Sequence, residues 1–249
     1  MKIELNNLQI SYLKKGEGTN KILLLHGWGS QKETLTGMIN HLSNFMEVYA
    51  IDLPGFGQSE EPKTVFNDDD YVNIVIEFIK KMNIKKLSLL GHSFGGRTII
   101  NLCNANDKSF EIDKLILLDS SGIRHYKKPS LKQKFYKVIF PIIKKISPKL
   151  LNTIKTKVGS DDYRNATPMM RDILVKAINT DIKDKIENIT YPTLIIWGEN
   201  DLATPYDDAK YINSKIKDSG IVTITNGGHF PFIDDPFLVN KALESFLNK

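Results

Sequence analysis

The sequence predicts an α/β domain with a mostly parallel sheet and helices on both faces. Short, continuously apolar runs recur along the 249-residue chain, which is typical of strands buried on both faces. Segments with helical periodicity separate most of these runs, and this alternation favours parallel strand pairing. The composition, 41% hydrophobic and 25% charged, is that of an ordinary globular protein.

Eight strands are expected. The first two should form a hairpin, because alternating runs at 2–5 and 8–13 flank Asn6-Asn7. Six apolar runs that end at turn signals predict the other strands, at 22–25, 45–51, 87–90, 115–118, 194–197 and 221–224. Helical patterns occupy 33–42, 69–82, 97–104, 205–217 and 236–247.

About 70 residues between Asp119 and Tyr191 interrupt this alternation with helical periodicity and no convincing strand. Thr167 and Pro168 are typical of the start of a helix over 167–179. An earlier apolar stripe, which Pro141 is expected to kink, consists of Leu131, Phe135, Val138, Ile142 and Ile146. We therefore expect a helical cap at 122–187, inserted after strand 6 over the carboxyl edge of the sheet, with a core domain formed by 1–121 and 188–249.

The basic charge of the chain is concentrated in this insertion. Between Arg124 and Lys157 there are eleven Lys or Arg and no Asp or Glu, which leaves 23 basic against 29 acidic residues elsewhere. This distribution argues against a nucleic-acid partner. The lysines are interpreted as a solvated outer face, as a surface that attracts anionic substrates, or as a weak contact with anionic lipid head groups.

A cytoplasmic protein is expected. The single cysteine, Cys103, cannot form an internal disulfide, and the first residues contain no signal-peptide apolar region. No stretch approaches the roughly 18 apolar residues of a membrane span. Phosphate-binding glycine loops, paired cysteines and His-rich metal spacings do not occur, so no cofactor or metal is predicted, and the sequence makes no prediction of oligomeric state.

The pattern Gly91-His92-Ser93-Phe94-Gly95 places G-x-S-x-G between an apolar strand and a helix. A serine at such a sharp turn has strained backbone geometry, and glycine neighbours relieve the crowding. A glycine-rich turn can also serve packing alone, but the flanking elements favour Ser93 as a nucleophile.

A serine hydroxyl needs a base to become a nucleophile. Among five histidines, His229 lies in a glycine-rich loop after the last strand, where it can reach the same edge of the sheet. His92 neighbours the serine and is expected to point away, and His41 is interpreted as a surface residue. His125 is either solvated or faces the substrate, and His26 is expected to hydrogen-bond nearby backbone.

The base in turn needs a carboxylate that fixes its tautomer. Asp201 follows the strand at 194–197 and is the preferred candidate. Glu199, which lies nearer to that strand, and Asp119, at the end of another strand, are the alternatives.

Backbone N–H groups of Trp28 and Phe94 are expected to form an oxyanion hole, because the loop after the third strand should face Ser93. Apolar residues of the loops and the cap are candidates for the substrate pocket: Trp28, Phe135, Phe140, Met169, Met170 and Phe230.

Five signals, each at a strand end, resemble the α/β-hydrolase superfamily: His26-Gly27, the Asp52–Ser59 loop, Gly91-x-Ser93-x-Gly95, Gly198-x-x-Asp201 and Gly228-His229. The resemblance implies the α/β-hydrolase fold and a serine–acid–histidine triad in that chain order. It also implies a structural role for the Asp52–Ser59 loop. Trp28 replaces a glycine of the lipase-type H-G-G-G loop, which argues against a lipase.

The resemblance implies a serine hydrolase of small acyl compounds, above all carboxylic esters, that forms an acyl-enzyme on Ser93 and uses water as the second substrate. Haloalkane dehalogenases and epoxide hydrolases of the superfamily carry Asp where Ser93 stands. Two alternatives stay open. One is a carbon–carbon bond hydrolase of ring-cleavage diketones, and the other is a non-catalytic small-molecule-binding protein of the same fold.

Overall fold

The computed structural model describes residues 1–125, 136, 139–141, 143, 147, 154 and 159–248 of the chain. One eight-stranded sheet has the strand order β1-β2-β4-β3-β5-β6-β7-β8. The strands are β1 (Lys2–Leu5), β2 (Leu8–Lys15), β3 (Lys21–Leu25), β4 (Glu47–Ile51), β5 (Lys86–His92), β6 (Glu111–Leu118), β7 (Thr193–Gly198) and β8 (Ser219–Ile224). All eight predicted strands are present.

The first two strands form the predicted antiparallel hairpin. Asn6 and Asn7 adopt φ values of 48° and 60°, the left-handed conformation that a tight two-residue hairpin turn requires. Strand β2 then pairs antiparallel with β4, and every later pairing is parallel. The prediction of a mostly parallel sheet is confirmed.

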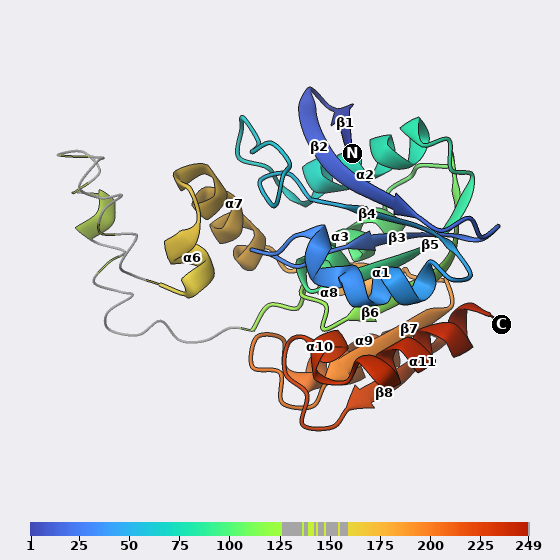
Figure 1. Cartoon of the computed structure of the whole chain (residues 1–249). Coiled ribbons are helices and arrows are strands. Elements are labelled where there is room, and N and C mark those ends of the chain that lie inside the picture. Colours follow the sequence, from blue (N-terminus) through green and yellow to red (C-terminus); the bar gives the residue numbers. More distant parts are fainter. Residues whose placement is uncertain are drawn as a thin grey trace.

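Helices cover both faces of the sheet, as predicted. Along β3, Leu23 and Leu25 join one buried apolar cluster, whereas Ile22 and Leu24 join another, because successive side chains of a strand point to opposite faces. The first cluster contains side chains of α2 (Asp68–Lys81), α3 (Phe94–Cys103) and α9 (Tyr206–Lys215). The second contains those of α1 (Thr36–Leu42) and α11 (Pro236–Leu247), which Figure 1 shows side by side.

The helices differ in detail from the prediction. The segment expected as one helix over 33–42 consists of a 3₁₀ turn, η1 (Lys32–Leu35), followed by α1. Three short helices were not predicted: α6 (Asp161–Asn165), α8 (Lys183–Ile186) and α10 (Pro231–Asp234). Each has only four or five residues, too few to give a periodic apolar pattern.

The chain between β6 and β7 contains α6, α7 (Pro168–Asn179) and α8. Figure 1 shows α6 and α7 beyond one end of the sheet-and-helix body. The predicted N-cap of α7 is present, since the Thr167 hydroxyl accepts a hydrogen bond from the Met170 N–H. Met170 is buried in the main apolar cluster and fixes α7 to the core. The apolar stripe predicted at 131–146 lies outside the described residues, and the cap boundaries at 122 and 187 stay a prediction.

None of the helices within the described ranges is long and apolar enough to cross a membrane.

A buried ion pair connects the loop after β3 to the loop after β4. The Lys32 ammonium donates to Asp52 Oδ2 at 2.8 Å and to the Ser11 hydroxyl at 2.9 Å. Burial alone would raise the pKa of Asp52, but hydrogen bonds from the Gln58 and Lys32 amides and from the Lys32 side chain lower it below its ordinary value. Asp52 therefore stays ionised and holds both loops in place.

Replacing Lys32 by Met should destabilise the fold by about 3–5 kcal/mol, because it leaves a buried carboxylate without its counter-charge. Glu33→Gln is the matched control. Glu33 also contacts Lys32, at 2.8 Å, but 48% of its side chain is exposed, so its loss should cost less than about 1 kcal/mol. Urea unfolding monitored by circular dichroism measures both. Equal losses in the two variants would contradict the assigned role of the pair.

Candidate active site

Ser93 occupies the turn between β5 and α3. Its backbone has φ 49° and ψ −109°, a conformation that side-chain-bearing residues rarely adopt. The turn is possible because Gly91 and Gly95 lack side chains: a Cβ on Gly91 would lie 2.5 Å from the Gly95 carbonyl carbon, and one on Gly95 would lie 2.2 Å from the Leu25 oxygen. The Ser93 N–H also donates to the Leu118 oxygen at 2.9 Å. The serine turn is thus hydrogen-bonded to the end of β6 and packed closely against the end of β3.

The structure brings together three side chains that are far apart in the sequence. Ser93 Oγ lies 3.0 Å from His229 Nε2, and His229 Nδ1 lies 2.7 Å from Asp201 Oδ2. Each residue follows a different parallel strand, β5, β7 or β8. Because the carboxyl ends of parallel strands share one edge of the sheet, these three loops converge.

Asp201 is held as an ionised acceptor. One oxygen accepts from the Ala203 and Thr204 amides at 2.7 and 3.1 Å, and the other accepts from the Thr204 hydroxyl at 2.6 Å as well as from His229. Burial raises the pKa of Asp201, but hydrogen bonds from His229 and Thr204 outweigh it and lower the pKa to about 2. A carboxylate at this place favours the proton on His229 Nδ1, which leaves Nε2 free to accept the serine proton.

Within the described residues, neither of the two competing carboxylates hydrogen-bonds to the His229 ring, whose nitrogens contact Ser93 and Asp201. Glu199 accepts a hydrogen bond from the Asn226 amide at 3.2 Å, at the turn after β8. Asp119 is fully buried and accepts from the Gly198 amide at 3.0 Å.

Asp119, Asp201 and His229 also form a group whose potential metal-ligating atoms lie within 4.8 Å of one another. Both ring nitrogens of His229 already have hydrogen-bond partners, Ser93 and Asp201. We therefore interpret the group as a hydrogen-bonded set rather than as a metal site.

The loop after β3 lies against the serine. A Cβ on Gly27 would stand 3.2 Å from Ser93 Cβ, and the Trp28 ring meets the Phe94 ring edge to face at 5.2 Å. The two residues whose amides were predicted to form an oxyanion hole therefore flank Ser93.

The buried His26 side chain fixes the backbone of this loop by hydrogen bonds. Its Nε2 accepts the Leu53 amide at 3.0 Å, so its Nδ1 carries the proton and donates to the Gly27 oxygen at 2.7 Å. Burial lowers the pKa of His26 to about 4, which keeps the ring neutral at physiological pH. His26 thus joins the loops after β3 and β4.

The expectation that His92 points away from the site is wrong. Its Nε2 donates to the backbone oxygen of His229 at 2.7 Å, and its ring lies 4.9 Å from the His229 ring and 5.1 Å from the Phe230 ring. Burial lowers its pKa to about 3, so the ring is neutral. His92 fixes the backbone of the loop that carries His229, a role that no local sequence signal identifies.

A cavity of about 770 Å³ lies in front of Ser93 and His229. Its apolar lining includes Trp28, Phe230 and Leu202. Its polar lining includes residues of the segment after β6 and of α6 and α9: Arg124, His125, Asp162 and Asp208. His125 pairs with Asp208 at 2.9 Å on this wall. His125, whose role the sequence left open, therefore faces the cavity.

The predicted pocket residues divide into three groups. Trp28 and Phe230 line the cavity. Met170 is buried in the apolar core and Met169 packs against that core, away from the cavity lining in the described part of the chain. Phe140 stacks on the Tyr136 ring at 5.1 Å, and Phe135 lies outside the described residues.

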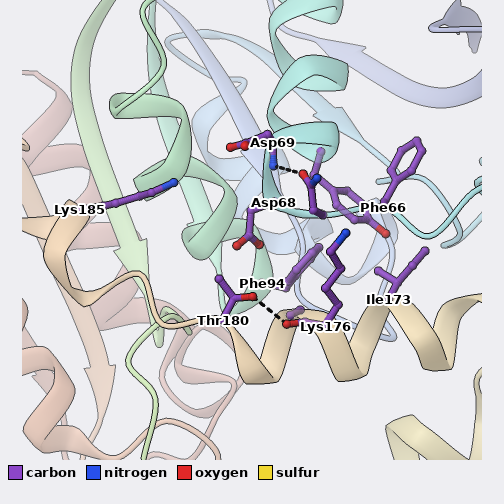
Figure 2. Close-up of a pocket in the computed structure, with 11 residues that line it drawn as sticks. Phe66, Asp68, Asp69, Phe94, Ile173, Lys176, Thr180 and Lys185 are labelled. Carbon is purple, nitrogen blue, oxygen red and sulfur yellow. Dashed lines mark hydrogen bonds between the residues drawn. The ribbon is translucent and has the colours of Figure 1, made fainter.

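A second cavity of about 240 Å³ adjoins the first between α2, α3 and α7 (Figure 2). Both cavities are lined by Phe94, Ala177 and Thr180. The Phe94 ring contacts Trp28 on one side and Tyr71 on the other, with ring centroids 5.2 and 5.0 Å apart. Phe94 therefore forms part of the partition between the two cavities.

Comparison with known proteins agrees with this architecture. The family model described as the alpha/beta hydrolase family matches residues 22–242. The crystal structure of bromoperoxidase from Bacillus anthracis superposes with a TM-score of 0.80 over 100% of this chain and 99% of that one, at 20% identity.

Two curated relatives have named activities. The chain is 27% identical to the pimeloyl-[acyl-carrier protein] methyl ester esterase of Wigglesworthia glossinidia brevipalpis, over 94% of this chain and 96% of the relative. It is 25% identical to the 2-hydroxy-6-oxo-6-(2'-aminophenyl)hexa-2,4-dienoic acid hydrolase of Metapseudomonas resinovorans, over 99% of this chain and 90% of the relative. The sheet order, the serine turn and the family match over most of its length show that the chain belongs to the alpha/beta hydrolase family.

Proposed function

We propose that the chain is a serine hydrolase of small carboxylic esters in which Ser93 is the nucleophile, His229 the base and Asp201 the acid. The observation that carries this proposal is the continuous hydrogen-bonded line from Ser93 Oγ to His229 Nε2 at 3.0 Å and from His229 Nδ1 to Asp201 at 2.7 Å. Ser93 and His229 also border the 770 Å³ cavity, so a substrate carbonyl can reach them.

In the first step, Ser93 Oγ attacks the ester carbonyl carbon while His229 Nε2 takes the hydroxyl proton. The ionised Asp201 stabilises the imidazolium that results. The carbonyl oxygen becomes an oxyanion, for which the Trp28 and Phe94 amides are the proposed donors. The amino end of α3, which begins at Phe94, adds a favourable dipole.

The tetrahedral intermediate then expels the alcohol, which receives the proton from His229, and an acyl group remains on Ser93. In the second step His229 takes a proton from water, the hydroxide attacks the acyl carbon, and Ser93 leaves with the proton. Each step returns His229 to its neutral state, and no reactant besides ester and water is needed.

The cavity supports a small substrate. Its volume of about 770 Å³ is in the range of small-molecule sites, and Trp28, Phe230 and Leu202 give it an apolar wall suited to an acyl chain. The esterase relative supports an ester substrate. The dienoic acid hydrolase relative, which aligns with nearly the whole chain, favours carbon–carbon bond hydrolysis as the second candidate.

We also propose that residues 122–187 form a cap over this cavity. Ile178 and Leu174 of α7 line it, and α7 is anchored to the core through Met170. The basic charges of 124–157 belong to this segment, so we propose that they raise the local concentration of anionic substrates.

Ser93→Ala should reduce turnover of a p-nitrophenyl ester by about 10⁶, because a complete triad loses nearly all of its advantage with its nucleophile. A fluorophosphonate probe should label the wild-type protein and not this variant. Ser121→Ala, which alters a serine on the same cavity wall, is the matched control and should keep its labelling. Wild-type protein that resists the probe would favour a non-catalytic binding protein.

The substrate class is tested by a chain-length series of p-nitrophenyl esters run beside a ring-cleavage diketone. We expect the esters to be hydrolysed in preference to the diketone, because the cavity is of small-molecule size and its apolar wall suits an acyl chain. Turnover of the diketone in preference to every ester would replace the ester proposal by the carbon–carbon hydrolase.

The basic segment is tested by salt. The screening length falls from about 30 Å at 0.01 M to about 3 Å at 1 M ionic strength. The kcat/KM for a half-ester with a free carboxylate should therefore fall as salt is added, while that for a neutral ester of equal length should stay constant. Lys127→Gln/Lys128→Gln should weaken the salt response. Equal salt responses of the two esters would exclude steering by the segment.

A further inference from the structure

Asp119 is a buried carboxyl beside the site with no part in the mechanism above. It is the first residue after β6, is fully buried, and adopts φ 41°, a rare conformation for an aspartate. The end of β6 is joined to the serine turn, because the Ser93 amide donates to the Leu118 oxygen and the Ser121 amide donates to the Ser93 oxygen. These two hydrogen bonds therefore fix the position of Asp119 relative to Ser93.

The carboxyl of Asp119 faces the acid and the base. One of its carboxyl oxygens lies within 4.8 Å of an Asp201 carboxylate oxygen and of a His229 ring nitrogen. One oxygen accepts the Gly198 amide, and the other is buried with no hydrogen-bond partner among the described residues. The Thr204 hydroxyl bridges the same three residues, at 3.1 Å from the Asp119 backbone oxygen, 2.6 Å from Asp201 and 3.4 Å from His229 Nδ1.

Two carboxylates this close and this buried do not both ionise. Asp201 collects the hydrogen bonds that favour a charge. Burial and the neighbouring charges of Asp201 and Asp234 raise the pKa of Asp119 to about 9, against the opposing effect of the Gly198 amide. Within the described part of the chain, the titratable groups placed beside Asp119 are Asp201 and Asp234, both acids, and His229. Because the Asp119 carboxyl accepts one amide hydrogen bond and Asp201 accepts several hydrogen bonds, the arrangement favours the proton of the pair on Asp119.

We propose that Asp119 is a reserve acid for His229, neutral while Asp201 is ionised and able to ionise and support the imidazolium when Asp201 carries no charge. This inference rests on the proposed function of Ser93 and His229. In Asp201→Asn the repelling charge is gone, so Asp119 releases its proton to solvent more readily. Its carboxylate then stabilises the positive ring from within 4.8 Å, without forming or breaking a covalent bond. Asp119 acts through His229 and is a positioning residue.

The first experiment compares ester hydrolysis by Asp201→Asn and by Asp119→Asn/Asp201→Asn between pH 6 and 10, each relative to wild type. A triad that loses its acid altogether loses about 10⁴ in turnover. The turnover of Asp201→Asn should fall by less than this factor. At pH values below the pKa of Asp119, its activity relative to wild type should rise by up to about tenfold per pH unit. The double variant should show the full loss and no such rise.

Glu199→Gln/Asp201→Asn is the matched control, because Glu199 is another carboxylate at the same sheet edge. It should behave like Asp201→Asn alone. Identical pH profiles for Asp201→Asn and Asp119→Asn/Asp201→Asn would overturn the proposal.

The second experiment needs no substrate and compares the Tm of wild type and Asp119→Asn from pH 4 to 8. Asp119 has a higher pKa in the folded than in the unfolded chain, so the unfolded chain releases this proton at lower pH. The free energy of unfolding of the wild type should therefore fall as pH rises from about 4 toward about 9. Asn keeps an acceptor for the Gly198 amide and has no proton to release. The Tm of the variant minus that of wild type should therefore increase with pH.

A Tm difference that stays constant from pH 4 to 8 would overturn the proposal, because Asp119 would then titrate as it does in the unfolded chain. This outcome is separate from failure of the proposed function. If Ser93→Ala kept full activity, the proposed triad would fall, while the Tm measurement would still report whether Asp119 holds the proton.

Discussion

The left-handed backbone of Ser93 is the constraint on which the rest of the site depends. A side-chain-bearing residue with φ 49° is unfavourable unless its surroundings hold it there. The surroundings do so in two ways. Gly91 and Gly95 allow the β3 backbone and the start of α3 to approach, and the end of β6 and the residues after it are hydrogen-bonded to Ser93. The hydroxyl is thereby presented at the sheet edge where the other two loops arrive.

Buried hydrogen bonds and one ion pair join the loops around Ser93 to one another. Neutral, buried histidines provide two of these links: His26 joins the loops after β3 and β4, and His92 holds the backbone of the His229 loop. The Lys32–Asp52 pair provides a third. Because these groups sit inside the protein, their bonds resist competition from water, and the site is organised before a substrate arrives.

The sequence predicted the sheet and the convergence of Ser93, Asp201 and His229, because apolar runs and strand-end motifs are local signals. It failed where long-range packing decides the outcome. His92 was expected to point away, yet a loop 137 residues later in the chain gives its ring a partner. Met170 was expected in the pocket but is buried in the core, since helical periodicity does not tell which apolar side chain faces the body. The helices of four or five residues left no periodic trace.

Phe94 contributes to the site through its backbone and through its ring. Its backbone begins α3 beside Ser93, while its ring stands between two cavities, one of them lined by α2, α3 and α7. Because the ring is buried and packs on Trp28 and Tyr71, a change in its size alters both the two cavities and the packing of the loop after β3. The space open to a small molecule and the packing beside Ser93 are therefore coupled through this single side chain.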